Sequence, residues 1–77
     1  MDANDGRKVH AHLAAVKLDG VANPVIQVIA EATGEILYTV RSPTGSFVPR
    51  VYEPGKYTVK AGKDQPDTVV AKGVEVG

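Results

Sequence analysis

The sequence contains no cysteine and no tryptophan among its 77 residues. The absence of cysteine excludes disulfide bonds, which many domains of this size use to reach a comfortable stability. A chain of this length removes only roughly 62% of its unfolded surface from water when it folds. We therefore expect a thin core, built without cross-links and with only one Phe and three Tyr as aromatic residues.

Net charge is also absent, because nine Lys and Arg balance nine Asp and Glu. Such a chain lacks the positive field that concentrates nucleic acids or anionic lipids around a protein, so we expect neither nucleic acid nor membrane as a partner. No apolar run approaches the roughly 18 residues of a membrane span. Met1 is followed by Asp2, Asn4 and Asp5 rather than by a signal peptide. We expect a mature or excised piece of protein.

The residues that are abundant favour strands and turns. Thirteen residues are Val, eight are Gly and five are Pro, whereas Leu occurs three times. Turn signals recur about every 8 to 12 residues, the rhythm of sandwiches and barrels. The predicted fold is an all-β, small antiparallel Greek-key sandwich of six or seven short strands. It occupies residues 8–77 as a single domain, after a flexible tail or interdomain linker at residues 1–7.

The first half of the domain contains one ambiguous segment and one predicted hairpin. Residues 8–18 carry apolar side chains on both parities, which leaves a strand, a pair of strands or a short Ala-rich helix open. Residues 25–30 and 36–41 are predicted as a hairpin. Gly34 in the turn between them is free to adopt the positive φ that tight turns need.

The second half of the chain is predicted as three further strand regions. Pro49 lacks an N–H group, so its strand is expected at an edge or with a bulge. Pro54 and Gly55 form the next turn, which brings the flanking strands antiparallel and makes both Phe47 and Tyr57 available to the core. Residues 68–76 are expected to form a last strand or strand pair, interrupted at Gly73.

One stretch resembles a known family. Its pattern is Gly45-x-Phe47-x-Pro49-x-x-Tyr52-x-Pro54-Gly55-x-Tyr57-x-Val59. It is similar to the signature of carboxypeptidase regulatory-like and collagen-adhesin B-type domains, which are prealbumin-like, Ig-like sandwiches, and Thr33-Gly34 stands where they commonly have a hairpin turn. Tyr52 departs from the pattern, because an aliphatic residue is more usual there. The resemblance covers about residues 18–62 and implies a non-catalytic module of a secreted or surface enzyme or adhesin.

A second resemblance runs along the whole chain. The order Asn23-Pro24-Val25-x-Gln27-Val28, Glu31-Ala32-Thr33-Gly34-Glu35 and Gly55-Lys56-Tyr57-Thr58-Val59 is similar to C-terminal accessory segments of secreted bacterial hydrolases, including phosphatase-like ones. It implies a parent protein whose catalytic domain is absent here. From the two resemblances we expect an extracytoplasmic location and a neighbouring domain of the same parent chain as partner. Exposed strand edges make a homodimer a second option.

Residues able to perform chemistry are sparse. His10 and His12 are two apart, so on a strand both imidazoles would project from one face toward one metal, but no third ligand is placed to complete the site. We interpret them as half-exposed strand residues and expect no metal and no cofactor. Ser42 and Ser46 flank a turn and match no nucleophile motif. The scattered carboxylates of Glu31, Glu35, Glu53 and Glu75 are interpreted as solvated charges.

Three functions follow from this pattern. The first is a non-catalytic accessory module that acts as a spacer, a stabiliser or a docking surface. The second is a binding module, either for carbohydrate through surface Tyr38 and Tyr52 or for a peptide that adds to an open sheet edge. The third is a small metal-dependent enzyme centred on His10 and His12. The sequence favours the first and predicts no catalytic residue.

Overall fold

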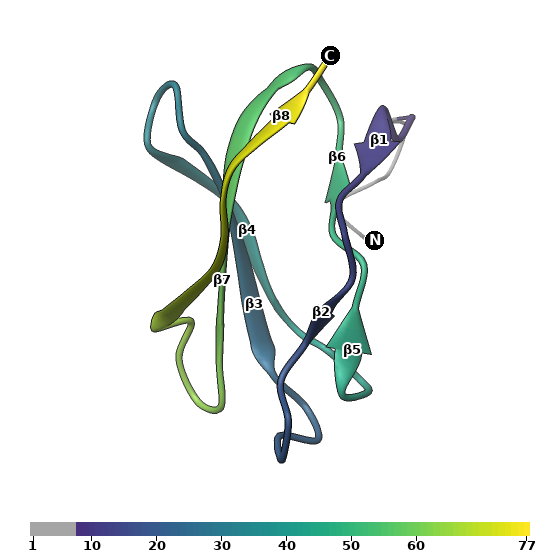
Figure 1. Ribbon diagram of the computed structural model, residues 1–77, viewed down its shortest axis with the longest axis vertical. Helices are drawn as coiled ribbons and strands as arrows, with labels where there is room; N and C mark the ends of the chain where they lie inside the picture. Colours follow the sequence, from purple (N-terminus) through teal and green to yellow (C-terminus); the bar gives the residue numbers. More distant parts are fainter. Residues whose placement is uncertain (1–7) are drawn as a thin grey trace.

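A computed structural model describes residues 8–77, and this range contains strands and turns but no helix. Eight strands follow one another along the chain (Figure 1): β1 Ala11–His12, β2 Val16–Lys17, β3 Val25–Ala30, β4 Glu35–Arg41, β5 Ser46–Phe47, β6 Arg50–Val51, β7 Gly55–Gly62 and β8 Thr68–Val76. All pairings between them are antiparallel. The predicted fold class, a small all-β antiparallel sandwich, is confirmed, whereas the predicted tail at residues 1–7 lies outside the described residues.

The larger layer is a four-stranded sheet in the order β4-β3-β7-β8. The predicted hairpin is its β3–β4 pair, with Ile26 opposite Val40 and Val28 opposite Tyr38. Gly34 in the connecting turn has a φ of 74°, as the turn requires. The register shifts after Val28, so Leu37 has no partner residue on β3. Along each strand of this sheet, successive side chains alternate between the face turned toward the second layer and the face turned away from it.

The second layer contains two extended segments, each interrupted in the middle, which we call the β1–β2 line and the β5–β6 line. The two lines are antiparallel, with β1 paired to β6 and β2 paired to β5. Residues 8–18 are thus extended, and the helical alternative for this segment is wrong. Pro49 separates β5 from β6, and its carbonyl accepts a hydrogen bond from Leu13. The strand expected at an edge or with a bulge is split at Pro49, and within residues 8–77 its two parts each pair on one side only, as edge strands do. The two breaks raise the strand count from six or seven to eight.

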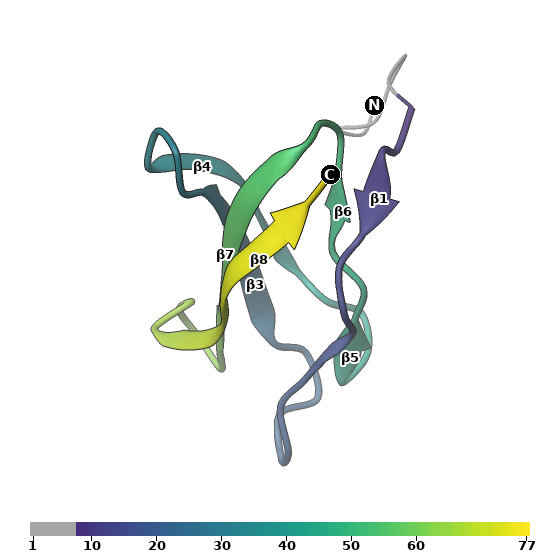
Figure 2. The ribbon, with the colours of Figure 1, turned by 45° about the horizontal axis from the view of Figure 1, so that its top comes forward.

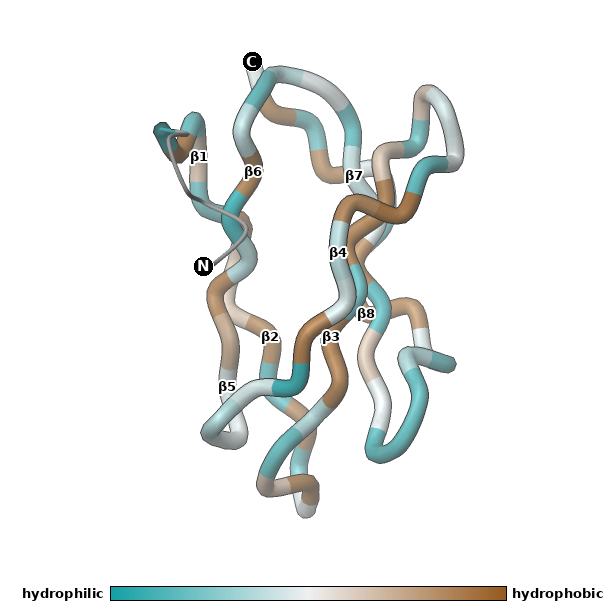
Figure 3. The backbone as a smooth tube through the Cα atoms, turned by 180° about the vertical axis from the view of Figure 1, so that it is seen from behind, coloured by the Kyte–Doolittle hydropathy of each residue, from teal (hydrophilic) through white to brown (hydrophobic). Residues whose placement is uncertain are grey.

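The core lies between the two layers. Its fully buried side chains include Ile26 and Val28 on β3, Val51 on β6 and Val59 on β7, and Tyr57 on β7 is 3% exposed. Figure 3 shows hydrophobic stretches of the chain along β3 and β4. Since each buried Val or Ile contributes about 1.5 to 3 kcal/mol, so few of them make the thin core that the chain length predicts.

The Pro54–Gly55 turn differs from the prediction in what it joins. The flanking strands β6 and β7 belong to opposite layers and do not pair with each other. The turn therefore carries the chain from the two-stranded layer to the four-stranded one (Figure 2). Both aromatic rings still reach the core, because Tyr57 is buried and Phe47 packs against the buried cluster.

Two contacts establish how the layers are aligned. Tyr38 on β4 bonds to Arg50 on β6, so the β5–β6 line lies on the β4 side of the molecule. The ring Nε2 of His10, just before β1, lies 2.9 Å from the carbonyl oxygen of Gly77, just after β8. The β1–β2 line therefore lies toward β8.

No helix capable of crossing a membrane is found within residues 8–77.

Candidate functional site

Tyr38 connects the two layers at one side of the sandwich. Its hydroxyl donates to the carbonyl oxygen of Arg50 at 2.7 Å and accepts from the amide of Arg50 at 3.0 Å. Burial raises the pKa of Tyr38 above its ordinary value, and the Arg50 amide, which stabilises a phenolate, opposes part of that rise. The ring is therefore fixed in place with its hydroxyl protonated and already bonded.

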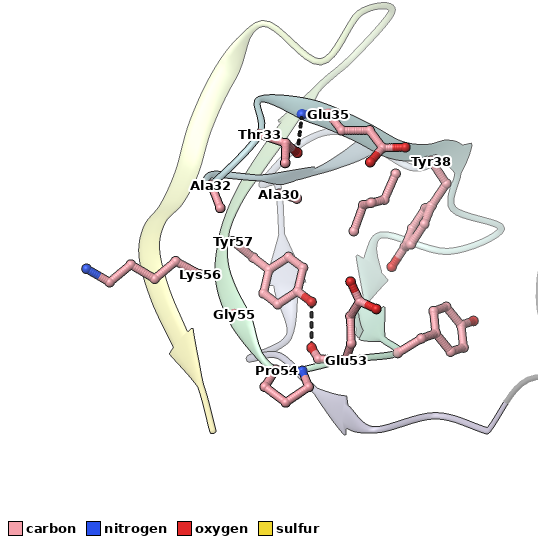
Figure 4. A pocket seen from close by; sticks show the side chains of 12 residues that line it. Ala30, Ala32, Thr33, Glu35, Tyr38, Glu53, Pro54, Gly55, Lys56 and Tyr57 are labelled. Carbon is pink, nitrogen blue, oxygen red and sulfur yellow. Dashed lines mark hydrogen bonds between the residues drawn. The ribbon is translucent and has the colours of Figure 1, made fainter.

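Tyr57 on β7, in the same sheet as Tyr38, is also held by a hydrogen bond from its hydroxyl to the main chain. Its hydroxyl donates to the carbonyl oxygen of Glu53 at 2.6 Å (Figure 4). This bond spans the Pro54–Gly55 turn and holds the residues before the turn against the first residues of β7. Gly55 has a φ of 152°, and the ring of Tyr57 lies in ordinary contact range of the position that a Cβ at Gly55 would occupy.

These two rings help to enclose a pocket of about 280 Å³ at one end of the sandwich. It lies between the β3–β4 turn and the β6–β7 turn. All three tyrosines of the chain, Tyr38, Tyr52 and Tyr57, line it, together with the acidic residues Glu35 and Glu53. Pockets that bind small molecules are commonly lined in this way, by aromatic surface with a few polar groups. This pocket is the best candidate site of the molecule.

The charged side chains around the pocket are arranged asymmetrically. In Figure 4 the carboxylate of Glu53 points into the space between the rings of Tyr38 and Tyr57. The Glu35 side chain extends along the opposite wall toward Tyr38, and the ammonium group of Lys56 points away from the pocket. The interior therefore combines ring surface with negative charge.

Tyr38 and Tyr52, the surface aromatics expected from the sequence, are brought together here. Both are half-buried and line the same pocket instead of a flat face. Tyr57, expected in the core, is buried there and also contributes to the pocket wall. The participation of Glu35 and Glu53 was not foreseen, because they lie in different turns and no spacing signal in the sequence shows that these turns meet.

The histidines lie elsewhere. His10 and His12 are both exposed, at and beside β1, and His10 contacts the Gly77 carbonyl. Within residues 8–77 no group of three or more His, Cys, Asp or Glu side chains is placed to hold a metal ion. The hydroxyl of Ser42 accepts from the Thr44 amide and donates to the Ser46 carbonyl, so this buried serine organises a turn, as its sequence position predicts.

A further polar cluster, formed by Glu31, Thr58 and Gly73, lies on the face of the four-stranded sheet that is turned away from the second layer. One carboxylate oxygen of Glu31, Oε2, accepts from the Thr58 hydroxyl at 2.6 Å and from the Gly73 amide at 2.6 Å. These bonds, with smaller contributions from nearby Lys72 and Lys56, lower the pKa of Glu31. Glu31 thus joins the end of β3 across β7 to the irregular part of β8, which the expectation of a merely solvated charge missed.

Comparison with known proteins adds no relative. Neither the family models, nor the curated proteins, nor the solved structures contain a match to this chain.

Proposed function

We propose that this chain is a non-catalytic β-sandwich accessory module that docks an extended segment of a larger protein. The observation that carries the proposal is the mismatch between its layers. Four paired strands face a layer that has only two strand lines within the described residues. Within residues 8–77, part of the inner face of the larger sheet therefore has no strand over it.

The uncovered part lies at β8. Ala71, Val74 and Val76 pack against the core cluster from β8, yet each remains half-buried. The β1–β2 line is the nearer one, as the contact between His10 and Gly77 indicates. Its edge away from β5 and β6 has no strand against it in residues 8–77. A strand added to that edge would continue the two-stranded layer over the inner face of β8.

This mode of docking is β-strand addition, in which main-chain hydrogen bonds give most of the affinity and alternate side chains enter the available surface. Open strand edges are templates for such pairing. The occupant we propose is a segment of a neighbouring domain of the same protein. Such a segment would bury the half-buried apolar side chains of β8 at all times, whereas a dissociating peptide would leave them exposed to water whenever it is unbound.

The proposal includes a family and a location. We place the chain among carboxypeptidase regulatory-like and collagen-adhesin B-type domains of prealbumin-like, Ig-like form, as an accessory part of an extracytoplasmic hydrolase or surface protein. Supporting this, Tyr57 and Val59 of the signature stretch are core residues, and Gly34 and Gly55 occupy turns at positive φ.

Amide hydrogen exchange tests the docking. We compare this chain alone with the protein encoded by its complete reading frame. Amides of residues 9–18 should exchange at least tenfold more slowly in the longer protein. Val76→Thr, on the inner face of β8, should reduce that protection, whereas Val69→Thr, at a side chain 50% exposed, should leave it intact.

Three results would contradict the proposal. One is a reading frame of only these residues whose product turns over a substrate by itself. Another is equal protection of residues 9–18 in the two proteins. The third is a stable dimer of the isolated chain in sedimentation, with residues 9–18 protected, which would make a second copy the occupant.

A further inference from the structure

The pocket at the turn end of the sandwich concentrates the aromatic side chains of the protein. The chain has four aromatic residues, and Tyr38, Tyr52 and Tyr57 all line this one pocket. Tyr57 is a buried core residue at 3% exposure, whereas Tyr38 and Tyr52 are half-buried. The space of about 280 Å³ that these rings help to enclose is large enough for a compact head group.

The hydroxyl hydrogens of two of these rings are already engaged. Tyr38 donates to the Arg50 carbonyl and Tyr57 donates to the Glu53 carbonyl. These rings therefore present their faces and edges to the pocket, while their donors are directed to the main chain. A neutral sugar, which needs several hydrogen-bond partners for its hydroxyl groups, would therefore find no hydrogen-bond donor on these two rings.

The charge of the pocket selects the sign of the ligand. The Glu53 carboxylate points between Tyr38 and Tyr57, Glu35 extends along the opposite wall, and the Lys56 ammonium points outward (Figure 4). An anion would meet two carboxylates there. A cation would gain both their attraction and the attraction of the negative ring faces, which is the basis of cation–π recognition of quaternary ammonium groups.

We propose that this pocket binds a compact organic cation, a quaternary or alkylated ammonium group, between its tyrosine rings and the carboxylates of Glu35 and Glu53. The two main-chain hydrogen bonds hold Tyr38 and Tyr57 in position before the ligand arrives, which reduces the entropy lost on binding. The site is separate from the open β1–β2 edge, so it does not depend on the docking function proposed above.

Titration by NMR and calorimetry tests the site with a matched pair of probes. Choline carries the quaternary ammonium group, and 3,3-dimethylbutan-1-ol has the same shape without the charge. Choline should bind with a dissociation constant in the millimolar range or tighter and at least tenfold more tightly than the neutral alcohol. The amide signals that shift should be those of the two turns, residues 31–35 and 52–57.

A second arm identifies the source of the cation. A short peptide containing trimethyllysine is compared with the same peptide containing unmodified lysine and with free choline. Tighter binding of the trimethyllysine peptide than of choline assigns the site to a protein side chain, and equal binding assigns it to a free head group. Binding of glucose or cellobiose in preference to choline would overturn the proposal.

Variants of the chain connect binding to the named residues. The double variant Glu35→Gln, Glu53→Gln and the single variant Tyr52→Leu should each weaken choline binding about tenfold. Glu75→Gln, which removes one exposed carboxylate on β8, is the control and should leave binding unchanged. All variants are first checked for a native NMR spectrum. Native spectra with undiminished choline binding in both pocket variants, or no choline binding to the unmodified chain, would refute the site.

Discussion

The hydroxyl of Tyr38 takes the place of a neighbouring strand for Arg50. It donates to the Arg50 carbonyl at 2.7 Å and accepts from the Arg50 amide at 3.0 Å, the two bonds that a paired strand residue would make. A phenol can do both, because its oxygen carries one donor and acceptor lone pairs. One side chain on β4 thus bonds to the main chain of β6 and fixes the separation of the two layers on the β4 side.

Tyr38→Phe should lower the free energy of unfolding by about 1 kcal/mol, the net value of a typical hydrogen bond. The loss stays near this value because Arg50 is exposed and water can reach its main-chain groups. Urea denaturation followed by circular dichroism measures it. An unfolding free energy equal to that of the unmodified protein would mean that the bridge between the layers is energetically neutral.

The same contact predicts how stability depends on alkaline pH. The pKa of Tyr38 is raised in the folded protein, so the folded state holds the phenolic proton more tightly than the unfolded state. This contribution is fully present below about pH 10, the ordinary tyrosine pKa, and is lost as the pH rises through the folded pKa. Urea midpoints across this range should therefore fall. In Tyr38→Phe the fall should be smaller, and an equal fall in both proteins would assign it to other groups.

Glu31 predicts the behaviour at acid pH with the opposite sign. Its pKa is lowered by the Thr58 hydroxyl and then by the Gly73 amide, so the folded state favours the ionised carboxylate. The stabilisation is present above the ordinary pKa of 4.5 and is lost as the pH falls through the lower folded value. Glu31→Gln should therefore be less stable than the unmodified protein at neutral pH, with the difference shrinking in acid. Glu75→Gln, at an exposed glutamate of β8, serves as the control. A pH-independent difference for Glu31→Gln would exclude the linkage.

The local elements of the sandwich were predictable because each rests on neighbouring residues. Tyr57, next to the Pro54–Gly55 turn, was predicted in the core, and it is 3% exposed. Gly34 predicted the β3–β4 turn for the same local reason. Residues 8–18 were ambiguous because their apolar residues fall on both parities, and tertiary pairing with β6 and β5 decided the outcome.

The relations between distant segments were not predictable. Pro54 and Gly55 indicated a turn, but a turn inside one hairpin and a turn between two layers use the same residues. The difference depends on which strand pairs with β6, and that strand is more than thirty residues earlier in the chain. The pocket follows from the same long-range choice: Tyr38 and Tyr52 were recognised as surface aromatics, while Glu53 became part of their site only because the two turns meet.

Gly73 and Gly62 should respond differently to the same substitution. Gly73 lies within β8 at a φ of 67°, and a Cβ there would meet nothing within 4 Å. Gly73→Ala should therefore cost only the left-handed backbone conformation, about 1 to 2 kcal/mol. Gly62, at the end of β7, is buried at an ordinary φ, but a Cβ would overlap the carbonyl oxygen of Gln65. Gly62→Ala should cost about 3 kcal/mol, because the backbone of the β7–β8 loop must move.

Asparagine distinguishes the two mechanisms. Its side chain tolerates the left-handed region better than alanine does, so Gly73→Asn should recover part of the stability that Gly73→Ala loses. At position 62 the obstacle is the Gln65 carbonyl, and a larger side chain cannot relieve it. Gly62→Asn should therefore be at least as destabilised as Gly62→Ala. Thermal unfolding of the four variants measures this, and recovery by asparagine at position 62, or none at position 73, would show that backbone conformation and steric overlap have been assigned to the wrong glycines.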